Sequence, residues 1–238
     1  MQGCLDLHMQ EMILILDFGS QYTQLIARRV REMNVYCEIH PYNNPPEITE
    51  NILGVILSGS PFSVRDEDAP NPDLTNIKGV VPLLGVCYGA QFLVHSNQGK
   101  VLPSKIREYG RANLSELDST SKLLADISID SQVWMSHGDT IQELPEGFKK
   151  ICSTADVVNA GFEIQNENTY GIQFHPEVYH STEGMNLLKN FVVGIANCKQ
   201  DWTPDSFVDV TIANLKNELG DDGVILGLSG GVDSSVAA

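Results

Sequence analysis

The sequence predicts an α/β fold with a mostly parallel central sheet and a small antiparallel meander attached to it. Two observations carry this prediction. In the first half of the chain, continuous apolar runs alternate with helical patterns, which is typical of parallel strands buried on both faces. After residue 149 the runs shorten and are separated by turns, as in a meander. Strands joined through helices imply right-handed crossovers.

Each element follows from a local pattern. Apolar residues recur at helical spacing from Tyr22 to Met33 and again in residues 184–198, which predicts two helices, and a further helix is expected from Ala90. Residues 62–82 form a long connection that we expect to serve as a lid or rim. The predicted strands are residues 12–16, 35–39, 54–57, 83–86, 149–154, 157–165 and 169–174.

The pattern divides the chain into three parts. Residues 1–11 are expected to form a flexible leader, and residues 12–200 one domain. Residues 201–238 are expected to supply a linker helix, with Thr203 and Pro204 at its N-terminus, and the start of a second domain. That start consists of an apolar run at residues 224–228, predicted to be a strand, and a glycine-rich loop.

Composition excludes several classes of function. The chain has 31 acidic and 15 basic residues, a formal charge of −16 that repels nucleic acid and anionic membrane surfaces, so neither is an expected partner. Its five cysteines lack the spacing of metal sites and form an odd set, which indicates a reducing compartment and a cytoplasmic location. No apolar run approaches the roughly 18 residues of a membrane span.

One cysteine has the surroundings of a nucleophile. Cys87 lies between Gly85 and Gly89, where a buried strand should turn sharply into a helix, and small flanking residues permit a strained turn that lifts a nucleophile above the sheet. A helix N-terminus there would favour the thiolate. The alternative interpretation is a buried structural cysteine.

A histidine and a glutamate at the end of a later strand complete a candidate triad. His175 and Glu177 are two residues apart, so in extended backbone their side chains point to the same side, and Pro176 stiffens the link. A cysteine nucleophile needs such a base and such an orienting group. A loop histidine beside a surface acid is the alternative, and a zinc site is disfavoured because no further ligand pair stands nearby.

Attack on a carbonyl also requires donors for the oxyanion. The backbone N–H of Tyr88, next to the nucleophile, is one candidate. The turn Ser58-Gly59-Ser60 is the second, because parallel strands bring their carboxyl ends to one edge of the sheet. Read by itself, this turn is also compatible with an ordinary loop.

Five motifs together resemble the class I glutamine amidotransferase domain of the guanosine monophosphate synthetase family. The resemblance covers residues 12–202 and implies a three-layer, flavodoxin-like fold. The motifs are Asp17-Phe18-Gly19-Ser20-Gln21, Gly85-Val86-Cys87-Tyr88-Gly89-Ala90-Gln91, Glu108-Tyr109-Gly110, Trp134-Met135-Ser136-His137-Gly138-Asp139 and Gln173-Phe174-His175-Pro176-Glu177-Val178.

The resemblance implies a glutaminase that needs no cofactor for this step. Cys87 would attack the side-chain amide of L-glutamine, release ammonia and form a glutamyl thioester that water hydrolyses to glutamate. His175 would move the proton, and Glu177 would orient the His175 ring. Gly59 and Tyr88 would form the oxyanion hole, although Ser60 stands where many relatives carry glycine. The substrate's amino and carboxylate groups would be bound by Gln91, Ser136, His137 and Asp139.

Residues Ser229, Gly230, Gly231, Val232, Asp233, Ser234 and Ser235 resemble the pyrophosphate-binding loop of the ATP pyrophosphatase domain in the same family. Glycines and hydroxyls before a helix offer donors to phosphate, and the Walker-type lysine is missing. In the complete enzyme, the resemblance implies that ATP activates xanthosine monophosphate, that Asp233 serves Mg²⁺, and that ammonia yields guanosine monophosphate. We expect these 238 residues alone to bind ATP weakly or not at all.

Two other functions fit the same sequence. A γ-glutamyl hydrolase of the same fold would use the same triad without passing ammonia on. A catalytically silent docking or regulatory module would need no triad, and the presence of Cys87, His175 and Glu177 speaks against it.

Overall fold

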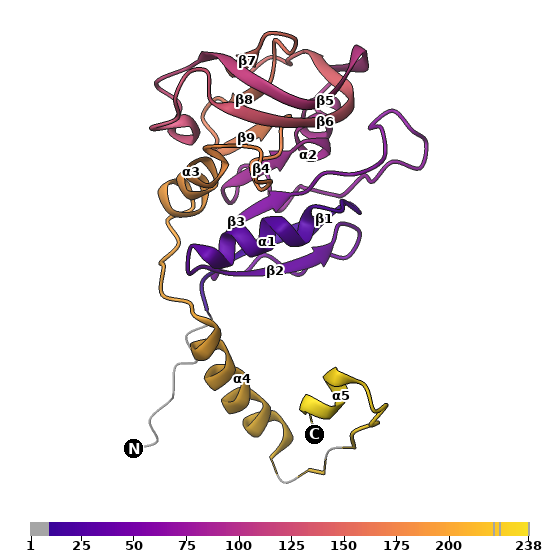
Figure 1. Cartoon of the computed structure of the whole chain (residues 1–238), viewed down its shortest axis with the longest axis vertical. Helices are drawn as coiled ribbons and strands as arrows, with labels where there is room; N and C mark the ends of the chain where they lie inside the picture. Colours follow the sequence, from indigo (N-terminus) through magenta and orange to yellow (C-terminus); the bar gives the residue numbers. More distant parts are fainter. Residues whose placement is uncertain (1–9, 221, 224, 238) are drawn as a thin grey trace. The chain divides into compact units, whose positions relative to one another are not determined.

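The structure is a computed structural model that describes residues 10–220, 222–223 and 225–237 (Figure 1). It divides into two compact units, residues 1–201 and 202–238, which are described separately below. Of the leader expected at residues 1–11, only Gln10 and Glu11 lie within the described residues.

The first unit contains the parallel sheet expected from the sequence. Its parallel strands lie in the order β2-β1-β3-β4-β9, which matches the 2-1-3-4-5 order of flavodoxin-like folds. The elements of this half are β1 (Met12–Asp17), α1 (Thr23–Glu32), β2 (Tyr36–Pro41), β3 (Ile52–Leu57), β4 (Leu83–Val86), α2 (Tyr88–Ser96) and β9 (Thr169–Ile172).

Helices cover both faces of this sheet and make three layers. Along β1, Ile13 and Ile15 belong to the core cluster that also contains residues of α1 and α3 (Gly184–Lys189), whereas Leu14 and Leu16 belong to the cluster on the α2 side. Alternate residues of a strand point to opposite faces. The continuous apolar runs seen in the sequence therefore reflect strands that are buried on both sides.

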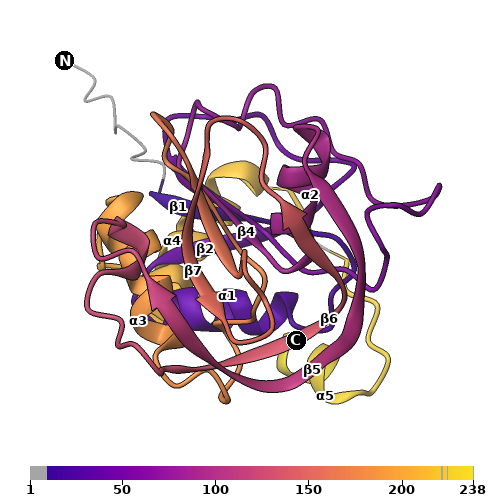
Figure 2. The same ribbon diagram turned by 90° about the horizontal axis from the view of Figure 1, so that it is seen from above.

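The antiparallel half is larger than the sequence indicated. A long hairpin of β5 (Lys100–Leu117) and β6 (Gln132–Glu143) curves along one side of the unit, with a 3₁₀ turn at Lys122–Leu124 between the strands (Figure 2). It joins the sheet through β7 (Phe148–Thr154), which pairs with β8 (Gly161–Ile164), and β8 pairs with β9. The hairpin carries the segment from Trp134 to Asp139 to the carboxyl end of the parallel strands.

Three sequence-based boundaries are corrected. Residues 157–160 are not strand, because Thr154 N–H bonds the Val157 carbonyl in a turn that precedes β8. Strand β9 ends at Ile172, and Phe174 makes only an isolated bridge to Met135. Of the predicted helix at residues 184–198, α3 covers Gly184–Lys189 and continues as a π-helix (Asn190–Ile195), whereas residues 196–198 lie outside it.

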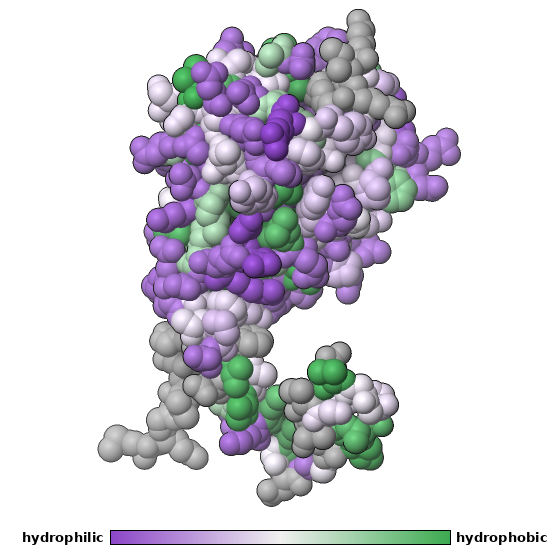
Figure 3. Space-filling view, viewed as in Figure 1, coloured by the Kyte–Doolittle hydropathy of each residue, from purple (hydrophilic) through white to green (hydrophobic). Residues whose placement is uncertain are grey.

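The second unit has helix α4 (Pro204–Leu219) and helix α5 (Val232–Ala237). The predicted strand at residues 224–228 is wrong for the described residues 225–228, because they have no neighbouring strand to pair with. Apolar residues are exposed on this unit, seen as green atoms in Figure 3, whereas the visible face of the first unit is mostly hydrophilic. None of the described helices has the length and apolar content needed to cross a membrane.

A glycine in β9 gives a test of the sheet packing. A Cβ added at Gly171 would lie 2.2 Å from Cζ of Phe162 on the paired strand β8, so we expect Gly171→Ala to destabilise the fold by about 1–3 kcal/mol in urea unfolding. Gly194→Ala, which meets no atom within 4 Å, is the matched control. Adding Phe162→Leu to Gly171→Ala should recover part of the lost stability. Equal stability of the two alanine variants would contradict the packing described.

Candidate active site

Cys87 occupies a strained turn between β4 and α2. Its backbone has φ of 52° and ψ of −105°, and such a conformation costs a non-glycine residue on the order of 1–3 kcal/mol. An added Cβ would lie 2.6 Å from the Gly89 carbonyl carbon if placed at Gly85, and 2.6 Å from Leu57 Cβ if placed at Gly89. Both glycines are therefore required by close backbone contact, which confirms the predicted strand, sharp turn and helix.

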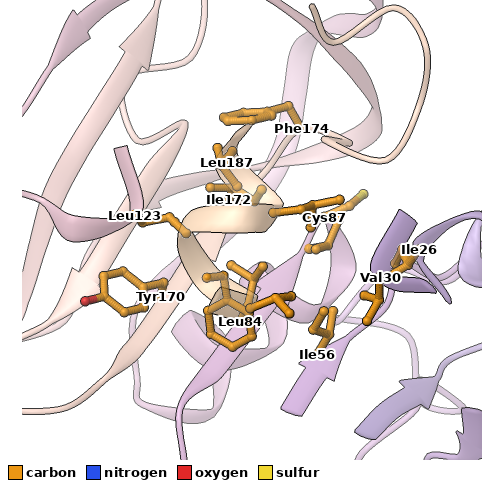
Figure 4. Packing of buried hydrophobic residues seen from close by; sticks show 14 of the residues in the cluster. Ile26, Val30, Ile56, Leu84, Cys87, Leu123, Tyr170, Ile172, Phe174 and Leu187 are labelled. Carbon is orange, nitrogen blue, oxygen red and sulfur yellow. The ribbon is translucent and has the colours of Figure 1, made fainter. Parts of the chain in front are cut away.

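Neighbouring strands hold this turn in place. The Cys87 N–H donates to the carbonyl of Ile172, the last residue of β9, at 2.8 Å, and the Gln91 N–H donates to the Cys87 carbonyl at 3.1 Å. Figure 4 shows Cys87 at the margin of the apolar cluster that contains Ile56 and Leu84. The cysteine is thus packed from below by the sheet core, and the chain that follows β9 passes beside it.

The candidate base and its orienting acid lie just beyond β9. His175 Nδ1 is 2.7 Å from Glu177 Oε1, and both side chains are almost fully buried. The backbone of this segment is fixed at several points: His175 N–H donates to the Trp134 carbonyl, Ser181 Oγ donates to the His175 carbonyl, and Arg29 Nε donates to the Glu177 carbonyl. The bond at Nδ1 leaves Nε2 as the ring nitrogen available for proton transfer.

Three further contacts place the imidazole beside the cysteine. A Cβ added at Gly59 would lie 3.3 Å from His175 Cε1 and 3.7 Å from Cys87 Cβ, so this glycine packs against both residues. The ring of Tyr22 lies edge-on to the His175 ring at 4.9 Å. Residues far apart in the sequence therefore meet at the carboxyl ends of β3, β4 and β9, as expected for a parallel sheet.

The protonation of His175 follows from its neighbours. Burial alone would lower the pKa of the imidazole, but the Glu177 carboxylate and Cys87, both as charges and as hydrogen-bond partners, outweigh burial and raise the pKa well above its ordinary value. Beside Cys87, the imidazole of His175 therefore holds its proton more tightly than a free histidine does.

The two candidate oxyanion donors come from turns that adjoin Cys87. The Tyr88 N–H is the first of helix α2 and, like the first N–H groups of any helix, has no acceptor within the helix. The turn that carries Gly59 is held by Ser58, whose Oγ accepts the Phe18 N–H and donates to the Gly59 carbonyl. Ser60 does not have a positive φ, so a serine fits this turn without the freedom of glycine.

The predicted substrate-binding segment lies on β6, opposite the turn. Cys87 Sγ is 3.9 Å from the Ser136 carbonyl. His137 is buried, and its pKa is lowered to about 4, first by burial, while a bond with the Asp139 backbone opposes the shift and the charge of His175 adds to it. His137 is therefore neutral at physiological pH. The carboxylate of Asp139 is also buried.

Gln91 lies behind this segment. Its Nε2 donates to the Asp139 carbonyl at 2.8 Å and lies 3.4 Å from Gln173 Oε1. Gln173 in turn accepts the Ile141 N–H and donates to the Asn159 carbonyl. Gln91 and Gln173 thus fix the backbone of β6 against α2, which is a positioning role that the sequence did not indicate for Gln173.

Two residues of the long connection reach the site as well. Both oxygens of the Asp139 carboxylate are engaged, Oδ1 by Arg65 Nη2 at 2.9 Å and Oδ2 by Ser63 Oγ. The sequence predicted a lid or rim at residues 62–82 but singled out neither residue. Contacts between positions more than 70 residues apart leave no local pattern that could have revealed them.

The glycine-rich loop belongs to the second unit. Ser229 Oγ lies 3.0 Å from Ser234 Oγ and accepts the Gly231 N–H, and Gly230 has φ of 80°. Nothing is described of the Asp233 side chain, so its expected role toward Mg²⁺ stays a prediction. Among the described residues, no group of three or more histidine, cysteine or acidic side chains is arranged to hold a metal ion.

Comparisons with known proteins show the family of the chain. The sequence profile of the family described as "Glutamine amidotransferase class-I" matches residues 14–195. A protein of Cytophaga hutchinsonii named "GMP synthase [glutamine-hydrolyzing]" is 62% identical over 230 residues, which are 97% of this chain and 45% of that protein. The chain thus spans less than half the length of these curated relatives.

Solved structures show the same fold. A Thermoplasma acidophilum protein has a TM-score of 0.67 at 26% identity, over 86% of this chain and 99% of its own. A glutamine amidotransferase of Thermotoga maritima has a TM-score of 0.59 at 18% identity, over 89% of this chain and 94% of its own. With the family profile covering most of the first unit, these findings lead to one conclusion: the chain belongs to the class I glutamine amidotransferase family.

Proposed function

We propose that this chain hydrolyses the side-chain amide of L-glutamine and is the glutaminase part of a guanosine monophosphate synthase. The observation that carries the proposal is the strained Cys87 turn beside the buried His175–Glu177 pair. The family supports a glutamine substrate, and the curated relatives named "GMP synthase [glutamine-hydrolyzing]" support the synthase.

The residues have distinct roles in the proposed reaction. The Cys87 thiolate attacks the amide carbon, and the N–H groups of Gly59 and Tyr88 stabilise the negative charge that develops on the amide oxygen. His175, held by Glu177, donates its proton to the leaving nitrogen, the carbon–nitrogen bond breaks, and ammonia leaves behind a glutamyl thioester. Neutral His175 then takes a proton from water, which attacks the thioester and releases glutamate.

The rest of the substrate is proposed to lie along β6. Ser136, His137 and Asp139 would contact its amino and carboxylate groups, and Gln91 would hold this segment from behind as well as border the pocket. The carboxyl group of Asp139 is the acceptor suited to an ammonium. No cofactor is required for any step of this hydrolysis.

The complete protein is proposed to use the ammonia in a second reaction. A synthetase part in the same chain would activate xanthosine monophosphate with ATP and Mg²⁺, and ammonia would displace the activating group to give guanosine monophosphate. Residues 229–235, with Asp233 toward Mg²⁺, would contribute to the ATP site. The exposed apolar residues of the second unit, including Val208, Ile225 and Leu228, support a larger structure around it. We propose a cytoplasmic location, in line with the free cysteines.

Replacement of the nucleophile tests the glutaminase directly. Cys87→Ala should reduce release of glutamate from glutamine to the background rate, because no other group can form the thioester. Cys198→Ala is the matched control, since burial raises the pKa of that thiol to about 12 and keeps it unreactive. Glutamate release would be followed by a coupled assay. Equal rates for Cys87→Ala and the unmodified chain would eliminate the mechanism.

The raised pKa of His175 predicts a dependence of stability on pH. Burial lowers this pKa, but the opposing effect of Glu177 and Cys87 is larger, so the net shift is upward. The folded chain therefore binds the proton more tightly than the unfolded chain, in which the pKa of the histidine is about 6.5. The resulting stabilisation is fully present below about pH 6.5 and is lost as the pH rises through the folded pKa.

Glu177→Gln should therefore shift the midpoint of the His175 ring titration, followed by NMR, to lower pH. It should also weaken the decline in unfolding free energy above about pH 6.5. Glu183→Gln, at a carboxylate that bonds Ser128 instead, is the matched control. An unchanged His175 midpoint in Glu177→Gln would show that the carboxylate does not hold the proton on the ring.

A further inference from the structure

The Arg65–Asp139 pair brings two opposite charges to the far end of the proposed substrate site. Arg65 Nη2 lies 2.9 Å from Asp139 Oδ1, with the Asp139 side chain 9% exposed and the Arg65 side chain 40% exposed. Arg65 comes from the connection between β3 and β4, and Asp139 from β6. The pair therefore joins a buried carboxylate to a guanidinium that is still partly open to solvent.

The spacing along β6 fits the length of glutamine. Ser136, whose carbonyl faces Cys87 Sγ, and Asp139 are three residues apart on one strand, a distance of about 10 Å. In glutamine, three carbon–carbon bonds separate the amide carbon from Cα, a distance of about 4 Å. Two contacts extend this length: that between Cys87 Sγ and the amide carbon, and that between the charged end of the substrate and the protein. The α-amino and α-carboxylate groups then lie at the level of Asp139.

The substrate's carboxylate needs a cation in this region. The chain has a formal charge of −16, which opposes the approach of any anion. His137 cannot serve as the cation, because its lowered pKa leaves it neutral, and His175 is committed to Glu177 and Cys87. Among the ion pairs of the described residues, Arg65 is the cation that contacts the β6 segment beside the nucleophile.

We propose that Arg65 binds the α-carboxylate of glutamine while Asp139 binds the α-ammonium, so that the pair recognises the amino-acid end of the substrate. This inference rests on the proposed glutaminase function. It assigns to the connection between β3 and β4 a direct part in substrate selection.

The pair can accept both groups without coming apart. A carboxylate has about four acceptor positions, and Arg65 and Ser63 occupy two of those on Asp139. The guanidinium has five N–H donors in a planar fork, so one can stay on Asp139 while others meet the substrate's carboxylate. Ser63 anchors the connection to the same carboxylate and keeps Arg65 near the site.

Covalent modification of Cys87 separates recognition from reactivity. The probe is 6-diazo-5-oxo-L-norleucine, an electrophile that carries the amino-acid end of glutamine, and iodoacetamide, which lacks that end, is the reference. Arg65→Ala should lower the second-order rate of modification by the first reagent about tenfold and leave the rate with iodoacetamide unchanged. Arg28→Ala, which removes a 72% exposed arginine on α1, is the matched control and should change neither rate.

Two truncated substrates identify the group that Arg65 binds. With 4-carbamoylbutanoate, which keeps the carboxylate and lacks the ammonium, Arg65→Ala should still raise KM for hydrolysis. With 4-aminobutanamide, which keeps the ammonium and lacks the carboxylate, the variant should match the unmodified chain. The reverse pattern would mean that Arg65 acts only by orienting Asp139, and the inference would fail.

The remaining outcomes are also decisive. If Arg65→Ala slows both reagents equally, Arg65 acts on Cys87 and not on the substrate, and the inference is wrong while the proposed function stands. If Arg65→Ala changes neither rate, the inference is wrong as well. If the unmodified chain reacts with iodoacetamide at Cys87 but not with the glutamine-like reagent, the proposed function itself fails, and the inference with it.

Discussion

The site depends on one backbone constraint, the turn that holds Cys87 at a positive φ. A non-glycine residue adopts this conformation only where its surroundings enforce it, and here Gly85 and Gly89 do so by packing backbone on backbone. The Ile172 carbonyl then fixes the Cys87 N–H. Because the same strand β9 leads on to His175, the bond that holds the proposed nucleophile also helps to position its proposed base.

The charges of the site follow from this placement. A buried imidazole would ordinarily lose its proton, yet His175 keeps it because a carboxylate stands on one side and Cys87 on the other. The pKa of His137 is lowered, first by burial and also by the charge of His175, although Asp139 opposes the shift, and His137 stays neutral. The two buried histidines of the candidate site thus differ in the direction of their pKa shifts.

The sequence predicted the parallel half of the fold well, and for a physical reason. Strands buried on both faces, such as residues 12–17, must be apolar throughout, and glycines at a tight turn stand out in any sequence. The same kind of local signal singled out Cys87, His175 and Glu177, whose catalytic roles stay a proposal. The hairpin was missed because β5 is long and contains Pro103, Gly110 and several charged residues, a composition more typical of a loop. The antiparallel pairing with β6 stabilises β5 as a strand, although its own sequence pattern does not predict one.

Contacts between distant segments were beyond the reach of local patterns. Nothing in the sequence around Arg65 indicates that it meets Asp139, and the two roles of Gln173 appear only when β6, α2 and the turn before β8 come together. The apolar run at residues 225–228 shows the opposite case, a strand-like pattern with no partner strand among the described residues. Strand pairing, rather than propensity, decided that β5 is a strand and that residues 225–228 are not.

The antiparallel strands β5, β6, β7 and β8 form a single excursion, leaving the parallel sheet after α2 and returning at β9, next to β4. Cys87 and the proposed base His175 follow the parallel strands β4 and β9, whereas the proposed substrate contacts Ser136, His137 and Asp139 lie on β6. Because the His175 N–H donates to the Trp134 carbonyl of β6, the two halves of the fold are also joined at the candidate site itself.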